Sequence, residues 1–377
     1  MILKDKKVAI IGAGPIGLTM AGLLQQQGID VTVYERDKHS EARIWGGTLD
    51  LHEDSGQVAL KKAGLLRGYL AMAKPMGRII TDKQGNVVLS VPPQHKTPEI
   101  NRNNLRQLLL NSLVENTVDW DSKFTSLTKE DDRWLLRFEN QPDAIADVVI
   151  VANGGMSAAR KYVTNVEAKY TGTFIIQGEI PEPEINCPEF YRLCNNSIFM
   201  TACNGVNFVA NPHNNGALTY NVTFRKPEEW LSNNRLDFQD KEVIAAFLSE
   251  MFSHWHESYR RLFSATTYFV GLPARVLLLD NQWEGNRPLP ITLIGDAAHV
   301  MPPFAGKGVN TGLMDALIVS DNFTNGKFDT LEAAIADYEK KMFVYARQAQ
   351  LETSTNEIAM HQPDFSFLKR FEAKLIV

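Results

Sequence analysis

Hydrophobic positions near the N-terminus change period in a way that predicts a strand, a helix and a second strand. The apolar run Val8–Ile11 has the length of a buried strand, and Leu18–Gln27 carries apolar residues at helical spacing. Val31–Tyr34 returns to a strand pattern, and Gly28 stands where a glycine can end the helix with a positive φ angle. This order is typical of a βαβ unit with parallel strands.

Later segments predict further buried strands and helices, and also a separate antiparallel sheet. Residues 147–151 and 290–294 predict two more buried strands, and residues 102–114 predict a helix. A hairpin is expected at 77–90, and the short runs between 171 and 225, separated by Asn and Gly, predict one mainly antiparallel sheet. After Asp329 the apolar spacing predicts a long C-terminal helix, with Asp329 and Glu332 as its capping pair.

Composition limits the kinds of protein this can be. With 377 residues and 44% apolar content the chain can bury a large core, and its length predicts two or three domains. A net charge of −5 provides no basic excess for nucleic acid. Without an apolar run long enough for a membrane span or a leader, we expect a cytoplasmic protein. Neither a redox CxxC pair nor zinc-type spacing occurs among the three cysteines, so we predict no metal site.

A glycine-rich turn joins the first predicted strand to the first predicted helix. Gly12, Gly14 and Gly17 fit GxGxxG, with Pro15 between the last two. The first glycine makes the turn, the second admits a pyrophosphate, and the third allows close helix packing. The phosphate would then lie at the helix N-terminus.

An acidic residue follows at the end of the second predicted strand. Glu35 stands where a carboxylate can accept hydrogen bonds from a ribose, and Arg36 beside it can reach the adenosine end. A glycine turn without a ligand is the alternative, but the strand, helix and acid together favour dinucleotide binding. This motif does not distinguish FAD from NAD.

A second motif, Leu293–His299 followed by Pro302–Asn310, is similar to the glutathione-reductase type of FAD-binding fold. The similarity implies that Asp296 binds the ribityl chain and that the backbone of Gly306, Gly308, Val309 and Asn310 lies along the isoalloxazine ring. Gly308–Asn310 also opens an apolar helix, whose free amides could stabilise negative charge on the flavin. His299 is more typical of a scaffold residue than of a catalytic one.

Two further segments resemble FAD-dependent hydroxylases. Asn153–Arg160 is similar to their DGxxSxxR segment, with Asn153 where most carry Asp. Whether this turn contacts NAD(P)H, the pyrophosphate or only the scaffold is left open. Arg102 matches the arginine that opens a helix and contacts FAD in these enzymes, and a solvated arginine at a helix start is the alternative.

Over nearly its whole length, the chain resembles the tetracycline-inactivating flavin monooxygenases, which are the Tet(X) type of class A aromatic hydroxylase. Its most particular segments are Glu41–His52, Asn153–Ser157 and Pro303–Gly306. The resemblance implies an α/β fold, with a glutathione-reductase-type FAD-binding Rossmann-like domain, an inserted mainly antiparallel β-sheet substrate domain and a long C-terminal bridging helix. It also implies NADPH contact by Arg43 and a place near the flavin for Asp50, with a surface ion pair as the alternative.

The domains implied are discontinuous. Residues 1–70, 95–170 and 271–327 are expected to bind FAD, residues 71–94 and 171–270 to bind substrate, and residues 328–377 to form the C-terminal helix and tail. Among family substrate contacts, Gln177 and Met200 match, while Ile198, Thr219 and Asn221 stand where the family has Arg, His and Gly. The remaining matches to family pocket residues are Phe304, Asn356, Met360 and Phe367, for which core packing is the alternative.

The resemblance implies a monomer with FAD as resident cofactor and NADPH and O₂ as co-substrates. Tetracycline-like substrates would be hydroxylated through a flavin C4a-hydroperoxide and thereby inactivated as antibiotics, with no catalytic residue needed beyond the flavin. One alternative is a flavin hydroxylase of another phenolic or polyketide compound, which the three replaced substrate contacts favour. Another is a flavin-bound ligand-binding protein without turnover.

Overall fold

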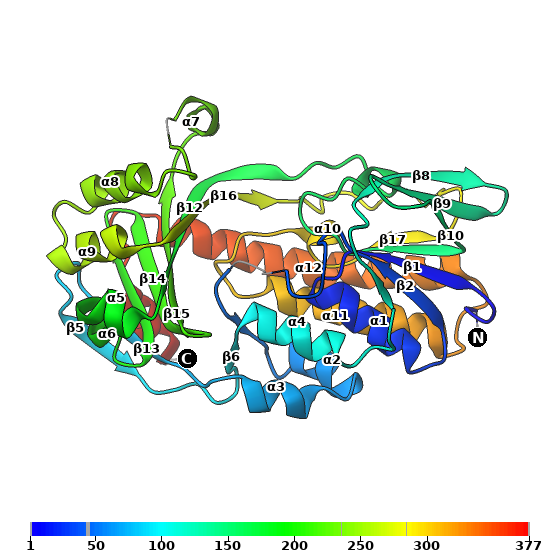
Figure 1. Ribbon diagram of the computed structural model, residues 1–377, viewed down its shortest axis with the longest axis horizontal. Coiled ribbons are helices and arrows are strands. Elements are labelled where there is room, and N and C mark those ends of the chain that lie inside the picture. Colours follow the sequence, from blue (N-terminus) through cyan, green and yellow to red (C-terminus); the bar gives the residue numbers. More distant parts are fainter. Residues whose placement is uncertain (1, 43–45, 235, 284, 376–377) are drawn as a thin grey trace.

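The computed structural model describes residues 2–42, 46–234, 236–283 and 285–375, and contains two sheet-based units side by side (Figure 1). A five-stranded parallel sheet forms the centre of the first unit, in the order β17-β11-β1-β2-β7. Its strands are β1 (Lys7–Ile11), β2 (Asp30–Tyr34), β7 (Val118–Asp119), β11 (Val148–Val151) and β17 (Ile291–Leu293). Every residue of β11 is buried, as expected for a parallel strand that is covered on both faces.

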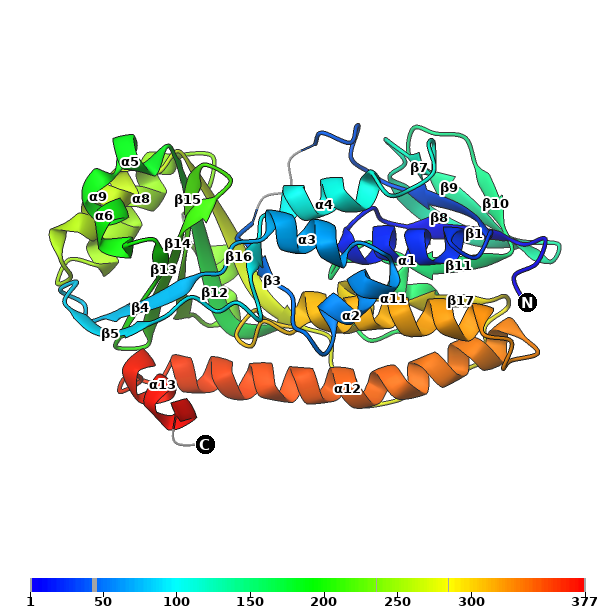
Figure 2. The same cartoon turned by 90° about the horizontal axis from the view of Figure 1, so that it is seen from below.

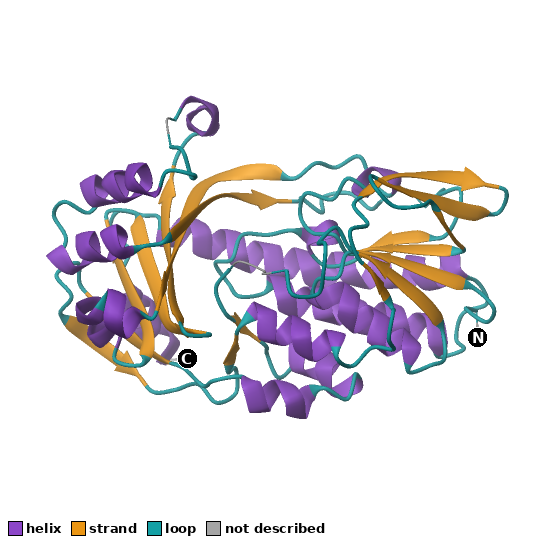
Figure 3. Ribbon diagram, in the orientation of Figure 1, coloured by secondary structure: helices purple, strands orange, loops and turns teal. Residues whose placement is uncertain are grey.

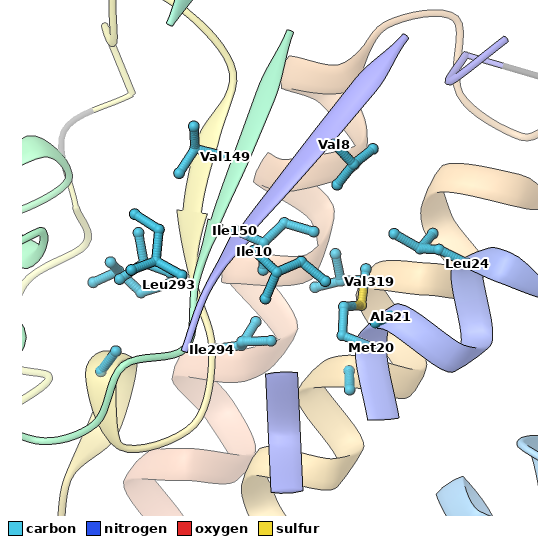
Figure 4. Close-up of a cluster of buried hydrophobic side chains, with 14 of the residues drawn as sticks. Val8, Ile10, Met20, Ala21, Leu24, Val149, Ile150, Leu293, Ile294 and Val319 are labelled. Carbon is cyan, nitrogen blue, oxygen red and sulfur yellow. The ribbon is translucent and has the colours of Figure 1, made fainter. Parts of the chain in front are cut away.

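Two helices cover one face of this parallel sheet. They are α1 (Pro15–Gln25) and α11 (Gly308–Thr324), and in Figure 4 Ile10 and Ile150 of the sheet point toward Met20 and Val319 of these helices. A small antiparallel sheet covers the other face, where Tyr34 stacks on Phe138 at a centroid distance of 4.7 Å. Its strands are β8 (Phe124–Glu130), β9 (Arg133–Phe138) and β10 (Ala144–Ala146).

Short elements complete the first unit. They are β3 (Leu49–Asp50) and β6 (Glu99–Ile100), the helices α2 (Gly56–Lys62), α3 (Leu66–Met72), α4 (Arg102–Leu110) and α10 (Asp296–His299), and a 3₁₀ turn (Arg160–Tyr162). The predicted start of α4 is confirmed, because Asn101 caps it by accepting hydrogen bonds from the amides of Asn103 and Asn104. The helix ends at Leu110, before the predicted residue 114.

A seven-stranded sheet forms the second unit, in the order β16-β12-β15-β14-β13-β4-β5. Its strands are β4 (Gly77–Thr81), β5 (Val87–Val91), β12 (Lys169–Pro181), β13 (Ser197–Cys203), β14 (Val206–Asn214), β15 (Ala217–Arg225) and β16 (Tyr268–Val276). Only β4 and β13 pair in parallel, so the predicted mainly antiparallel sheet is confirmed. Strand β16 continues past residue 270, which was the expected end of the substrate domain.

Helices cover one face of the seven-stranded sheet and leave the other turned toward the first unit (Figure 1 and Figure 3). On the covered face, Phe208 and Tyr220 of the sheet pack with Tyr259 and Phe263. The helices of this unit are α5 (Pro183–Asn186), α6 (Pro188–Cys194), α7 (Glu228–Asn233), α8 (Lys241–Met251) and α9 (Glu257–Ala265). Because side chains alternate along a strand, every second residue of β12 and β15 lies on the opposite face.

A long helix, α12 (Leu331–Met360), runs beside both units and ends near α13 (Phe367–Leu375) (Figure 2). Its thirty residues span about 45 Å. The predicted Asp329–Glu332 capping pair is wrong: Thr330 is the N-cap, and its hydroxyl accepts from the Ala333 amide at 3.1 Å. Within the described part of the chain, none of the helices has the length and apolar content needed to cross a membrane.

Candidate cofactor and substrate site

The glycine turn has the shape that the motif predicts. Gly12 has a φ angle of 108°, and a Cβ there would lie 2.7 Å from the Ala152 carbonyl oxygen. At Gly17 a Cβ would lie 2.1 Å from the Gly12 oxygen. At Gly14, by contrast, a Cβ would have no neighbour within 4 Å, and Pro15 opens α1 directly afterwards. The open side of Gly14 therefore faces the position predicted for the pyrophosphate, at a helix N-terminus that suits it.

Glu35 holds this turn in place. Its carboxylate accepts from the Ala13 amide at 2.6 Å and from the Asp37 amide at 3.0 Å, and the side chain is buried. The oxygens retain lone pairs for a ribose hydroxyl. Arg36, predicted to reach the adenosine end, is exposed, and Arg43 lies outside the described residues.

The loop at Gly295 and Asp296, called the Gly-Asp loop below, places a carboxylate close to the start of α11. Gly295 has a φ angle of 63°, which turns the chain so that Asp296 begins α10. A Cβ at Gly308 would lie 3.8 Å from Asp296 Oδ1. The Asp296 side chain is solvent-accessible but lies deep among protein atoms. Its restricted hydration raises the pKa of Asp296, against the opposing charges of His299 and Arg102.

The segment around Asn153 is fastened to the Gly-Asp loop through Arg160. This buried guanidinium donates to the Ala297 carbonyl at 2.9 Å, to the Gly155 carbonyl at 2.6 Å and to the Asp296 carbonyl at 3.4 Å. All three acceptors are backbone oxygens. Of the roles left open for this turn, the described contacts of Arg160 support a scaffold role that orients Asp296.

Arg102 and Asp50 bring a third segment to the same place. Arg102 Nε donates to the Gly47 carbonyl at 2.9 Å, and burial lowers the pKa of Arg102 while the charge of Asp296 raises it. A Cβ at Gly306 would lie 3.4 Å from Asp50 Oδ1. The three segments that carry Arg102, Asp50 and Asp296 therefore converge, although they are distant in sequence.

Asn310 holds these segments together by its side chain. Its Oδ1 accepts from the His52 amide at 2.8 Å, and its Nδ2 donates to the carbonyls of Asp50 at 2.9 Å and Gly306 at 3.1 Å. The side chain is thus occupied by the protein. What α11 offers a flavin is the backbone of its first turn, from Gly308 through Val309 to Asn310, where amides have no partner within the helix.

His299 lies beneath the loop as a scaffold residue, which agrees with the interpretation from sequence. It is fully buried, and its Nε2 lies 2.6 Å from Asp315 Oδ2, which also accepts from the Gly295 amide at 2.7 Å. Tyr345 donates to Asp315 Oδ1 at 2.5 Å. Burial alone would lower the pKa of His299, but the charges of Asp315 and Asp296 raise it above its ordinary value.

The predicted substrate residues of the sheet share its uncovered face. Gln177 and Asn221 are register partners on β12 and β15, and Thr219 and Ile198 lie on the adjacent row of the same face. The row through Gln177 crosses all seven strands: Val270, Gln177, Asn221, Val209, Met200, Ile80 and Leu89. Two neighbouring members of this row, Gln177 and Asn221, are polar, and the other five are apolar.

The apolar stretch of the row that contains Val209, Met200, Ile80 and Leu89 is covered by the C-terminal segment. Phe304, Met360 and Phe367 form one hydrophobic cluster with Ile80, and Met200 packs against it. Asn356 Nδ2 donates to the Phe304 carbonyl at 3.0 Å, which ties the loop before α11 to α12. Met360 and Phe367 therefore lie in a packed hydrophobic cluster, as the alternative of core packing predicts. Phe304 belongs to the same cluster and to the loop that leads into α11.

A polar network that we did not predict joins the segment 46–50 to the sheet. Asn211 donates to the Thr48 hydroxyl at 2.9 Å, and Asn214 donates to the Gly46 carbonyl at 3.0 Å. Thr48 in turn donates to Glu99 at 2.6 Å. Burial and the charge of the cross-strand Asp50 raise the pKa of Glu99 to about 6. No spacing in the sequence could have indicated these contacts, because their partners come from distant elements.

Comparison with known proteins agrees with this arrangement. A family model described as an FAD binding domain matches residues 5–325. Monooxygenase asqM of Emericella nidulans is 26% identical, with 92% of this chain and 93% of that protein covered. The 3-amino-4-hydroxybenzoate 2-monooxygenase of Streptomyces cremeus is 26% identical, with 84% and 78% covered. The crystal structure of tetracycline destructase Tet(55) superposes with a TM-score of 0.80 at 22% identity, covering 100% of this chain and 96% of that one.

Since the family model matches most of the sequence, the chain belongs to the FAD-binding domain family. It is an FAD-dependent monooxygenase, as the relatives of similar length and the shared fold indicate. The predicted α/β fold class and the predicted FAD are confirmed. Inactivation of tetracycline stays a prediction, as do NADPH, the monomeric state and the individual site residues.

The described residues fit FAD on two observations: the open side of Gly14 and the accessible carboxylate of Asp296. We therefore predict that Asp296→Ala raises the dissociation constant for FAD about tenfold or more, because the carboxylate that would accept a hydrogen bond from a ribityl hydroxyl is removed. The free energy of unfolding of the apoprotein should change by less than about 1 kcal/mol, since an accessible side chain is lost. Flavin fluorescence quenching measures the first quantity, and urea titration the second.

An exposed acid on the neighbouring helix provides the control for Asp296→Ala. Asp321→Ala removes a carboxylate from α11 that contacts Asn325 and no part of the cofactor loops. This control should bind FAD like the wild type. Wild-type FAD affinity in Asp296→Ala would contradict the role assigned to that carboxylate.

Proposed function

We propose that this monooxygenase uses NADPH and O₂ to hydroxylate a planar, electron-rich aromatic compound, a phenol or a tetracycline-like polyketide. The observation that carries the proposal is the position of Gln177: a Cβ at Gly47 would lie 4.0 Å from its Nε2, and Gly47 is the residue that binds Arg102. The polar pair Gln177 and Asn221 therefore adjoins the segment that contacts the cofactor residues. The relatives named for aminohydroxybenzoate and tetracycline support an aromatic or polyketide substrate.

Bound FAD would supply the electron transfer to oxygen and the delivery of one oxygen atom to the substrate. The residues of the chain have three tasks. Gly14, Glu35 and Asp296 hold the cofactor, and the first turn of α11 directs its unpaired amides and positive dipole end at the flavin. Gln177 and Asn221 orient the substrate, and Phe304 with its apolar cluster keeps water from one side.

Within this proposal, the replaced contacts favour a smaller phenolic compound over tetracycline itself. Ile198 and Thr219 stand where the resembled family has two polar anchors for the drug. Ile198 is buried, and Thr219 Oγ accepts from Asn214 at 3.3 Å, so neither replaces a cation or an imidazole. These residues therefore favour an aromatic hydroxylase that acts on a substrate other than tetracycline.

We expect the purified protein to be yellow with FAD and to oxidise NADPH severalfold faster when its substrate is added. The test is a screen of tetracycline, hydroxybenzoates, hydroxyquinolines and other phenols, with NADPH oxidation followed by absorbance and products by mass spectrometry. One added oxygen atom per product, derived from labelled O₂, is the expected result. If every compound leaves the oxidation rate unchanged, or accelerates it with peroxide as the sole product, hydroxylation is excluded and a ligand-binding role without turnover is favoured.

A further inference from the structure

Two side-chain amides face each other on neighbouring strands of the substrate sheet. Gln177 on β12 and Asn221 on β15 are register partners, and Gln177 Nε2 donates to Asn221 Oδ1 at 3.2 Å. This bond leaves Gln177 Oε1 as an acceptor and Asn221 Nδ2 as a donor. If both amides were turned over, the pair would still present one donor and one acceptor. The edge of the pair is therefore complementary to any group with an N–H beside a C=O.

The remaining atoms of the pair are available to a ligand. Gln177 Oε1 and Asn221 Nδ2 form no hydrogen bond with other described residues, and neither is among the described polar atoms that are fully buried without a partner. Gln177 as a whole is only 8% exposed. A donor and an acceptor without protein partners, on side chains that are largely buried, are positioned to bind a ligand or water.

The rows on either side connect the amide pair to both halves of the site. On one side, Thr219 of the adjacent row accepts from Asn214. Asn214 also donates to the Gly46 carbonyl, in the segment that contacts Arg102 through Gly47. On the other side, Thr223 lies 3.1 Å from His361 Nε2, and the His361 ring packs edge-on against Phe304 at a centroid distance of 5.3 Å. A planar ring bound to the amides would thus lie between the cofactor segments and an aromatic side chain.

Charge on this face disfavours an anionic substrate. Arg78 Nη2 lies 3.8 Å from Glu99, so its charge is already partnered, and Glu179 adds a buried acid in the row next to Gln177. Arg225, at the end of β15, donates to the Thr171 carbonyl. Among the described residues, the row of Gln177 and the two rows beside it therefore contain no cation other than the partnered Arg78, and Arg225 lies one row further out. Burying a substrate carboxylate at this centre would be costly.

Resting on the proposed function, we propose that Gln177 and Asn221 bind the N–H and C=O of a ring lactam, and that the substrate class is an uncharged planar aromatic lactam. The acceptor Gln177 Oε1 takes the ring N–H, and Asn221 Nδ2 donates to the ring carbonyl. Asn221, which replaces a glycine of the resembled family, makes this recognition specific to the present chain.

Equilibrium binding to the FAD-loaded protein tests this proposal without turnover. The probes are carbostyril, which has a ring N–H beside its carbonyl, and coumarin, the lactone of nearly equal shape that has an oxygen in place of the N–H. We expect carbostyril to bind about tenfold more tightly, because coumarin leaves the Gln177 acceptor without a donor. The dissociation constants come from flavin absorbance changes or calorimetry, and para-hydroxybenzoate, an anion, should bind more weakly than carbostyril.

Two variants assign the preference to the amides. Gln177→Ala should reduce the preference for carbostyril over coumarin to within about twofold, and Asn221→Ala should weaken both probes by a similar factor of about fivefold, since both have the carbonyl. Gln84→Ala, in the exposed turn between β4 and β5, is the matched control and should keep the tenfold preference. FAD content, measured by absorbance, should be equal in all three.

Each outcome decides the proposal. Equal binding of carbostyril and coumarin, absence of binding for both, tighter binding of para-hydroxybenzoate, or a tenfold preference that persists in Gln177→Ala would overturn it. These results leave the monooxygenase proposal standing if another aromatic compound is hydroxylated by NADPH and O₂. Conversely, lactam binding without oxygen transfer to any compound would contradict the proposed function and leave the recognition intact.

Discussion

Gly14→Ala should fold like the wild type and lose FAD, whereas Gly17→Ala, three residues further on, should fail to fold. A Cβ at Gly14 meets nothing within 4 Å and would project into the space predicted for the pyrophosphate. At Gly17 the Cβ would lie 2.1 Å from the Gly12 carbonyl oxygen, and because this oxygen belongs to the backbone, no side-chain rotation can relieve the clash. The same substitution therefore has opposite consequences at two glycines of one motif.

The expected magnitudes separate the two effects. For Gly14→Ala we predict that the dissociation constant for FAD rises at least tenfold, while the unfolding free energy of the apoprotein falls by less than about 1 kcal/mol, the cost of a poorer N-cap. For Gly17→Ala we predict insoluble or unfolded protein, since overpacking against backbone exceeds the usual cost of about 1–3 kcal/mol. Calorimetry with FAD and far-UV circular dichroism measure the two quantities.

Gly28→Ala is the control for loss of a glycine outside the cofactor turn. Gly28 ends α1 with a φ angle of 72°, and a Cβ there would meet nothing within 4 Å. The strain should lower stability by about 1 kcal/mol and leave FAD binding unchanged. If Gly14→Ala binds FAD as tightly as this control, the pyrophosphate does not pass Gly14.

The elements that the sequence predicts correctly are those fixed by neighbours along the chain. The βαβ opening, the positive φ at Gly28 and the start of α11 at Gly308 depend on a few consecutive residues and their backbone requirements. The capping of α12 shows the limit of this reasoning. Asp329 and Thr330 are both good N-caps by residue type, and the observed choice of Thr330 depends on where the chain leaves α11, which a local pattern does not contain.

What the sequence does not predict depends on contacts between distant segments. The β8–β10 sheet has alternating residues, yet its position against the parallel sheet depends on side-chain packing such as Tyr34 on Phe138. The bonds from Asn211 and Asn214 to the segment 46–50 likewise join residues more than 160 positions apart. Asparagine is common in loops and strand ends, so its type alone gave no signal of this role.

The buried acid beneath the Gly-Asp loop should be among the most costly residues of the chain to remove. Asp315 is fully buried on α11, where its carboxylate contacts the Gly295 amide, His299 and Tyr345. Asp315→Ala leaves the His299 charge and two donors without an acceptor. Because removing one member of a buried ion pair costs about 3–5 kcal/mol, we expect a loss of that size in the unfolding free energy of the apoprotein. Asp321→Ala, on the exposed side of α11, should change it by less than about 0.5 kcal/mol.

The pH dependence distinguishes loss of this ion pair from a simple packing defect. The pKa of His299 is raised in the folded protein above its ordinary value of 6.5, so protonation favours folding. Its contribution is complete below about pH 6.5 and is lost as the pH rises through the raised pKa. Wild-type protein should therefore lose stability across that interval. Asp315→Ala should show a smaller loss, because the larger of the two charges that raise the His299 pKa is absent and only that of Asp296 remains. Urea titrations of both proteins from pH 6 to pH 9 measure this difference, and parallel pH profiles would show that Asp315 does not hold a charged His299 beneath the loop that presents Asp296.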